Sequence, residues 1–191
     1  MPHLKLEVLD KTKHDRKRFS CGIDSLDSYL HNYARQNQDA CTAVCHVFVR
    51  AERPERIVGY FTLSQHAVDP GSEHEALFRE QPRIARTVAV PTTLIGRLAI
   101  DRDFQGERLG EALLVEALRT ALTASQKVAS AAVLVDPNSA SARQFYEKFG
   151  FRLLNQESGR LFITMDTVAH NFSRATQPVD REEAASVHDV P

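Results

Sequence analysis

The sequence lacks the features that would place the protein in a membrane, secreted or metal-binding class. No apolar run approaches the roughly eighteen residues of a membrane-spanning helix. The N-terminus, Met1 to Lys5, does not have the shape of a signal peptide. The three cysteines, Cys21, Cys41 and Cys45, form no disulfide framework and indicate reduced thiols. Because no second ligand cluster matches Cys41, Cys45 and His46, we expect a cytoplasmic protein without a metal.

Net charge is nearly absent as well. The formal charge is −1 over 191 residues, which is too neutral for an obvious nucleic-acid-binding protein. The charge is unevenly distributed, since residues 1–165 sum to +2 and the remainder to −3. Basic residues gather in the first twenty positions and at Arg79, Arg83 and Arg86. These three arginines are candidate contacts for RNA phosphates, and ordinary solvated surface charge is the alternative.

The chain has the size and composition of one globular domain. Hydrophobic residues make up 42% and charged residues 26% of the sequence, which is ordinary for such a domain. From about residue 170 the sequence becomes polar. We therefore assign residues 1–169 to a domain and 170–191 to a flexible tail.

The order of the predicted elements indicates an α/β (α+β) fold. Alternating or β-rich runs predict strands over 4–9, 43–50, 57–64, 94–101, 128–135, 151–154 and 161–167. Helices are expected over 110–124 and 139–149, with a long loop over 65–87 that holds a short helix near 75–79. Another helix is expected after a cap at Asp24, with an apolar side of Leu26, Tyr29, Leu30, Tyr33 and Ala34. Such an order gives a mixed sheet with a central pair of parallel strands. Where these two strands splay apart, they leave a slot for an elongated ligand.

The segment from Gln105 to Gly110 is the first chemical motif. It reads Gln-Gly-Glu-Arg-Leu-Gly and joins a predicted strand to an apolar helix. A turn of this kind leaves backbone N–H groups unpaired at a helix N-terminus, where the helix dipole adds partial positive charge. The corner therefore suits a diphosphate.

A second motif follows at Ala142, Phe145, Tyr146, Gly150 and Phe151. The two motifs together resemble the GNAT superfamily of N-acetyltransferases. This resemblance implies a mixed twisted sheet with a splayed parallel pair, acetyl-CoA as co-substrate and Tyr146 as the general acid that protonates the departing thiolate. It also implies a set of residues that bind acetyl-CoA, the acetyl donor: Leu98, Ala99, Ile100, Gln105, Gly106, Glu107, Arg108, Leu109, Gly110, Glu111, Asn138 and Phe145.

Arg108 departs from the superfamily pattern, which has glycine at this position. A right-handed backbone at Arg108 would tolerate the side chain and let the guanidinium reach an acidic group. A positive φ would instead strain the loop. The second case keeps open a catalytically weak GNAT-fold module that only binds a partner.

Other segments extend the resemblance to a subgroup. The runs 19–30, 58–64 and 96–101, together with Pro91, resemble the GNAT toxins of toxin–antitoxin modules. Those toxins acetylate the amino group of aminoacyl-tRNA and are neutralised by a small ribbon–helix–helix antitoxin. The resemblance therefore implies aminoacyl-tRNA and an antitoxin as partners. A homodimer of this chain is a further possibility.

The absence of an evident base agrees with such an acceptor. His66, expected just beyond a strand end, is the nearest candidate, and a surface histidine is the alternative. Deprotonating a lysine at pH 7 costs about 4.6 kcal/mol, whereas an α-amine with a pKa of about 8 costs little more than 1 kcal/mol. An α-amine therefore needs less help, although acetylation of a small amine or antibiotic stays open.

Overall fold

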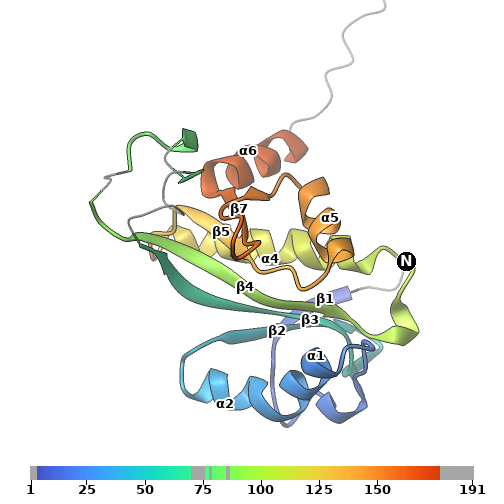
Figure 1. Cartoon of the computed structure of the whole chain (residues 1–191). Helices are drawn as coiled ribbons and strands as arrows, with labels where there is room; N and C mark the ends of the chain where they lie inside the picture. Colours follow the sequence, from blue (N-terminus) through green and yellow to red (C-terminus); the bar gives the residue numbers. More distant parts are fainter. Residues whose placement is uncertain (1–3, 70–75, 78, 85–86, 177–191) are drawn as a thin grey trace, which may run out of the picture.

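Seven strands form one sheet with helices on both faces (Figure 1). The structure is a computed structural model that describes residues 4–69, 76–77, 79–84 and 87–176. The strand order is β1-β2-β3-β4-β5-β7-β6. All neighbouring strands are antiparallel except β4 and β5, which are parallel. The expected α/β class and the central parallel pair are therefore confirmed.

The strands are β1 (Leu4–Val8), β2 (Val44–Arg50), β3 (Arg53–Val68), β4 (Val90–Ile100), β5 (Ala132–Val135), β6 (Arg152–Leu153) and β7 (Leu161–Thr164). The longer helices are α4 (Leu109–Ser125), α5 (Ala140–Lys148) and α6 (Met165–Thr176). Shorter helical segments are η1 (Arg16–Arg18), α1 (Asp24–Ser28), η2 (Tyr29–Tyr33), α2 (Ala34–Asp39) and η3 (Arg102–Phe104).

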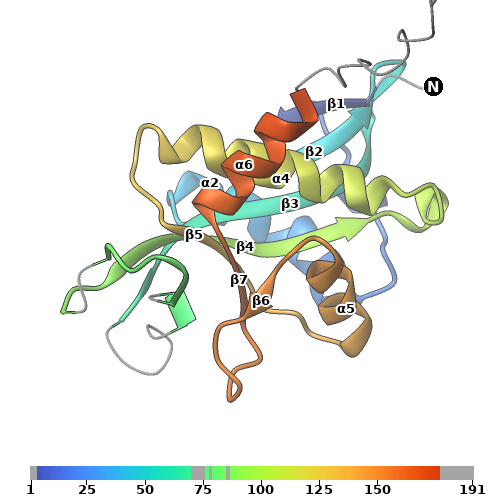
Figure 2. The same cartoon turned by 90° about the horizontal axis from the view of Figure 1, so that it is seen from above.

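Alternation along the strands divides the main core between the two faces of the sheet. On β3, Phe61 packs under α4 and α5, whereas its neighbour Tyr60 packs against α1 and η2, because successive side chains of a strand point to opposite faces. Figure 1 shows α1 and α2 below the sheet and α4, α5 and α6 above it. Seen from above in Figure 2, α6 crosses α4 while α5 lies apart from both. A third cluster joins β5 and β7 to residues near Leu77.

The parallel strands separate where β4 contains a bulge. Pairing between β4 and β5 ends at Ile95 and Val135. On the other side of β4, Arg97 is opposite Thr62 and Ile95 is opposite Leu63, so Gly96 has no partner on β3. A bulge bends the strand that carries the extra residue. The slot between β4 and β5 therefore opens beyond Gly96.

The first helix differs from its expected form. Asp24 begins α1 rather than capping it, and Ile23 holds the cap position without a side-chain hydrogen bond. The chain then widens into a π-helical turn from Tyr29 to Tyr33. This turn rotates Tyr33 out of the apolar side, so that it is 53% exposed. A regular spacing of three and four residues does not reveal such a turn.

Several element ends also differ. β3 runs through Val68 and β4 begins at Val90, so the long loop is shorter than expected. The strand expected over 128–135 is reduced to β5, and Val128 is 58% exposed. The last strand ends at Thr164, where α6 begins. Residues 170–176, assigned to the tail, belong to α6, while 177–191 lie outside the described residues.

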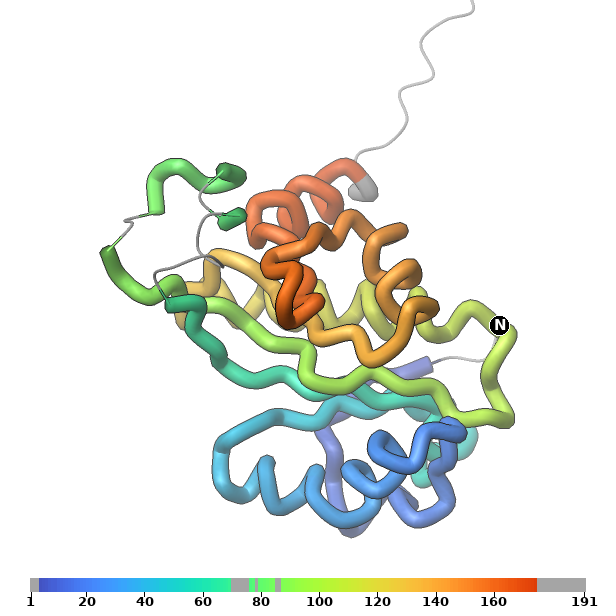
Figure 3. The backbone as a smooth tube through the Cα atoms, in the orientation of Figure 1, coloured from blue at the N-terminus to red at the C-terminus, as the bar shows by residue number. Residues whose placement is uncertain are grey.

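In the part of the chain that the structure describes, no helix is long and apolar enough to cross a membrane. Figure 3 traces the backbone from β4 through the corner at 105–110 into α4, which connects the sheet to the helices above it.

Candidate active site

A cavity of about 330 Å³ lies where β4 and β5 separate. Its walls come from both faces of the sheet. Ile23 and Leu26 belong to the α1 side, whereas Ala142, Phe145 and Tyr146 belong to α5. The remaining lining residues are Ile95, Gly96, Arg97, Leu98, Asp136, Pro137, Asn138, Ser139 and Ser141. We call this cavity the slot.

The corner after β4 forms a second, more open cavity at the N-terminus of α4. It is lined by Ile100, Phe104, Gln105, Gly106, Arg108, Leu109, Gly110, Glu111 and Phe145. No side chain caps α4 at this end. A Cβ added at Gly106 would meet no atom within 4 Å. The corner is therefore an open helix N-terminus, which suits phosphate, and Phe145 links it to the slot because this side chain lines both cavities.

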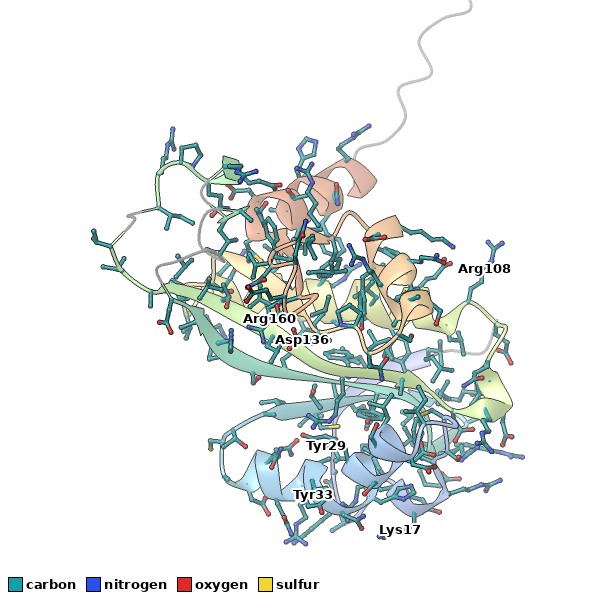
Figure 4. All side chains as sticks on the ribbon, in the orientation of Figure 1. Lys17, Tyr29, Tyr33, Arg108, Asp136 and Arg160 are labelled. Atoms are coloured by element: carbon teal, nitrogen blue, oxygen red, sulfur yellow. The ribbon has the colours of Figure 1, made fainter. Side chains whose placement is uncertain are left out.

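Arg108 adopts the strained conformation that the sequence left open. Its φ is 57° and its ψ is 20°, in the left-handed region. This conformation costs a residue with a Cβ about 1–2 kcal/mol, whereas glycine adopts it freely. The corner therefore keeps the backbone shape that glycine would give it. The Arg108 side chain is exposed and points outward in Figure 4.

Two other corner side chains are held by contacts within the protein. The Gln105 amide donates hydrogen bonds to the carbonyl oxygens of Cys21 and Ile100, each at 3.0 Å. Glu107 pairs with Arg50 at 3.2 Å. These contacts anchor the corner to the segment before α1 and to β2.

β4 contributes three of the expected donor-binding residues. Leu98 lines the slot and Ile100 lines the corner. Successive side chains of a strand point to opposite faces, so Ala99, which lies between them, is buried in the α1-side core. Ala99 therefore offers the ligand its backbone alone.

Tyr146 contributes both to the core and to the slot. Its ring packs edge-on against Phe145 and Phe151, with centroid distances of 5.3 and 5.4 Å. Only 9% of the residue is exposed, yet it lines the slot. Burial raises the pKa of the Tyr146 phenol to about 12. The hydroxyl therefore keeps its proton at neutral pH, as a proton donor must.

The slot also contains charged residues that sequence analysis did not identify as functional. The Arg97 guanidinium lies 3.5 Å from the centroid of the Tyr29 ring. Asp136 follows β5 directly and pairs with Arg160 at 2.7 Å. A carboxylate immediately after a buried strand was the available signal for Asp136, but its arginine partner is 24 residues away in sequence.

His66 does not act as a base beside the slot. It lies inside β3 rather than beyond a strand end, and its Nε2 is 2.8 Å from Nη1 of Arg160. Arginine can only donate, so Nε2 accepts this hydrogen bond. Its lone pair is therefore already used.

The basic residues considered for RNA lie in separate places. Arg79 and Arg83 are exposed, and Arg86 lies outside the described residues. Figure 4 shows Lys17 at the opposite end of the molecule from the segment around Arg79. Lys17 also donates to Asn32 at 3.0 Å. The two basic stretches thus do not form one continuous face.

A larger cavity of about 590 Å³ lies away from the slot, beside the β2–β3 turn. Phe104 separates it from the corner, and its walls carry charges of both signs: Arg18, Arg50, Glu52, Arg53, Glu55, Arg56 and Asp103, with Val58. Neither Tyr146 nor any residue of α5 lines it. Size alone therefore does not identify the reaction centre.

Among the described residues, no group of three or more His, Cys, Asp or Glu could hold a metal ion.

Comparison with known families and proteins agrees with this geometry. Residues 43–153 match the model of the acetyltransferase (GNAT) domain. The chain is 32% identical over 151 residues to a protein of Mycobacterium tuberculosis named tRNA-acetylating toxin, covering 79% of this chain and 86% of that protein. It is 24% identical over 170 residues to the probable toxin TacT of Sinorhizobium fredii, covering 85% and 92% of the two chains.

Solved structures share the fold across most of the chain. A tyrosine-to-phenylalanine mutant of KacT superposes with a TM-score of 0.77 at 26% identity, covering 88% of this chain and 99% of that one. A mutant of the toxin AtaT, bound to acetyl-CoA and to the C-terminus of the antitoxin AtaR, gives 0.73 at 25% identity, covering 91% and 99%. The splayed sheet is therefore shared with proteins of this kind.

Proposed function

The chain belongs to the GNAT acetyltransferase family, and we propose that it is a toxin that acetylates the α-amino group of aminoacyl-tRNA. It is an acetyl-CoA-dependent N-acetyltransferase. The single observation that carries the proposal is the slot lined by Tyr146, in a chain 32% identical to a tRNA-acetylating toxin. The proposed compartment is the cytoplasm.

The residues present fit acetyl-CoA. The uncapped N-terminus of α4 offers N–H groups to the diphosphate. The segment of β4 from Gly96 to Ile100 connects this corner to the closed end of the slot, about 13 Å along the strand. Asn138 and Phe145 form the opposite wall. This arrangement supports placing the thioester at the closed end, beside Gly96.

Acetyl transfer then needs two contributions from the protein. The backbone of Leu98, which lines the slot, offers an N–H to stabilise the oxyanion that forms on the acetyl carbonyl. Tyr146 donates its phenolic proton to the thiolate sulfur as the C–S bond breaks. The neutral amine attacks the carbonyl carbon directly and its surplus proton passes to solvent, so the acetyl group never resides on the enzyme.

Walls from two faces of the sheet suggest separate approaches for the two substrates. The corner and α5 hold the donor on one face, while Ile23 and Leu26 border the slot on the other. We assign the α1 side to the acceptor. By analogy with the AtaT complex, a small antitoxin is the proposed protein partner.

Label transfer from radiolabelled acetyl-CoA tests the proposal. Aminoacyl-tRNA should accept label, whereas deacylated tRNA and a panel of small amines should accept little. Acetylation of small amines without aminoacyl-tRNA would reject the toxin function and leave a small-amine acetyltransferase.

Tyr146→Phe separates chemistry from binding. The variant keeps the packed ring but removes the proton donor, so turnover should fall about 100-fold while acetyl-CoA affinity in calorimetry stays nearly constant. Leu153→Val, a mild core change away from the slot, is the matched control. Wild-type turnover in the Phe variant would show that Tyr146 serves packing alone.

A further inference from the structure

The charge inside the slot is sparse. Among its lining residues, all of which the structure describes, only Arg97 and Asp136 are charged. The Arg97 guanidinium stacks on Tyr29 from the α1 side. Asp136 is therefore the carboxylate that a cationic substrate meets in this cavity.

Asp136 stands at the closed end of the slot. The last paired residues of the parallel strands are Ile95 and Val135, and Asp136 is the first residue after β5, which ends at Val135. The corner for the phosphates lies at the opposite end of the same stretch of β4. Asp136 is thus on the thioester side of the cavity, near the bulge at Gly96.

Arg160 fixes the orientation of this carboxylate. Its Nε donates to Oδ1 at 2.7 Å and its Nη2 donates to Oδ2 at 2.9 Å. Each carboxylate oxygen keeps a second lone pair for another donor. The Asp136 side chain is 48% exposed, whereas Arg160 is 18% exposed. Figure 4 shows the two residues side by side.

A third residue holds the arginine. Nη1 of Arg160 donates to Nε2 of His66 at 2.8 Å, so β3 supports the pair from across the sheet. Arginine can only donate, so Nε2 of His66 is the acceptor of this hydrogen bond. Both members of the Asp136–Arg160 pair are consequently held before any substrate arrives.

We propose that Asp136, oriented by Arg160, binds the α-ammonium group of the aminoacyl acceptor; this inference rests on the proposed function. An α-amine with a pKa of about 8 is mostly protonated at pH 7, so it reaches the slot as a cation. The free lone pairs of Asp136 accept its hydrogen bonds and set the nitrogen beside the thioester. One ammonium proton then passes to solvent, because the pKa of the amine lies only about one unit above pH 7, and the neutral amine attacks. Arg160 offsets part of the charge, and the contribution of Asp136 is therefore mainly directional. Arg160 acts as a positioning residue.

Two matched acceptors isolate this contact. One tRNA is charged with an amino acid, and the other carries the corresponding α-hydroxy acid, which lacks the positive charge. Wild-type enzyme should bind the aminoacyl form about tenfold more tightly, and Asp136→Asn should remove most of that preference. KM for aminoacyl-tRNA should rise in the variant by a similar factor while acetyl-CoA affinity stays constant. A tenfold preference retained by Asp136→Asn would overturn the proposal.

Controls separate orientation from mere structure. Asp39→Asn removes an aspartate that pairs with Arg35 on the surface, at 3.2 Å, and should leave acceptor preference unchanged. Arg160→Gln should lower the preference, and Arg160→Lys should restore part of it. If wild-type enzyme transfers no label to aminoacyl-tRNA, the proposed function itself fails. If it does transfer label and Asp136→Asn behaves as wild type, only the role of Asp136 fails.

Discussion

The two parallel strands of the sheet are each followed by an aspartate that pairs with an arginine, and the two pairs differ in burial. Asp101 follows β4 and pairs with Arg56 at 2.8 Å, and their side chains are only 3% and 9% exposed. Asp136 follows β5 and lines the slot, and its side chain is 48% exposed to solvent. The same chemical pair therefore serves as an anchor at one strand end and offers free lone pairs at the other.

The partners of Asp101 explain its anchoring role. Its carboxylate also accepts the backbone N–H groups of Ser20 and Asp103. Arg56 additionally donates to Asp103 and to the carbonyl oxygen of Arg18. This network ties the N-terminal segment, β3 and the start of the corner together. On Asp136, the carboxylate lone pairs that accept backbone N–H groups in Asp101 are the ones that we propose accept hydrogen bonds from a substrate.

Removing the buried arginine should have the largest effect. Arg56→Met leaves the Asp101 carboxylate buried without its counter-ion, which costs about 3–5 kcal/mol of unfolding free energy. Urea denaturation measures this loss. Adding Asp101→Asn to the variant should recover part of the stability, and a loss below about 1 kcal/mol would place the pair among ordinary surface ion pairs.

Relieving the strain at the corner should have a smaller effect of opposite sign. Arg108→Gly removes the cost of a left-handed residue with a Cβ and should stabilise the protein by about 0.5–1 kcal/mol. Arg108→Ala keeps the Cβ and is the control, with stability expected near that of wild type. Equal gains in both variants would attribute the change to the guanidinium rather than to the backbone.

Removing Arg160, the arginine of the less buried pair, should have the smallest effect on stability. Arg160→Met leaves Asp136 accessible to water, so the loss should be about 1 kcal/mol or less. The same urea titration compares it directly with Arg56→Met. Equal losses in the two variants would contradict the distinction between a buried anchor and an open pair.

Local signals explain what could be predicted from the sequence. Ser139 accepts the N–H of Ala142 at the start of α5, and Gly150 has a φ of 85° just after its end. Both positions carry residue types that favour these roles. The glycine-containing corner and Tyr146 were likewise identified because each belongs to a short contiguous motif. The roles proposed for the individual donor-binding residues stay predictions.

Long-range contacts explain what could not be predicted. Arg160 and His66 are 94 positions apart, and no pattern in either segment connects them. The spacing of Leu26, Tyr29 and Tyr33 fits a regular helix, so the π turn was missed. In α6, Phe172 reaches the core four residues after Val168, but the polar residues beyond 169 favoured a tail. In each case tertiary packing decided the structure.

A slot bordered from both faces of the sheet also bears on how such an enzyme diversifies. The proposed acetyl-CoA side is formed by residues 98–111 and 138–146, and the proposed acceptor side begins with Ile23 and Leu26. These segments are distant in sequence and border the slot from opposite faces of the sheet. Substitutions on α1 can therefore remodel the choice of acceptor without altering the donor machinery, so that one acetylation scaffold remains available for many different targets.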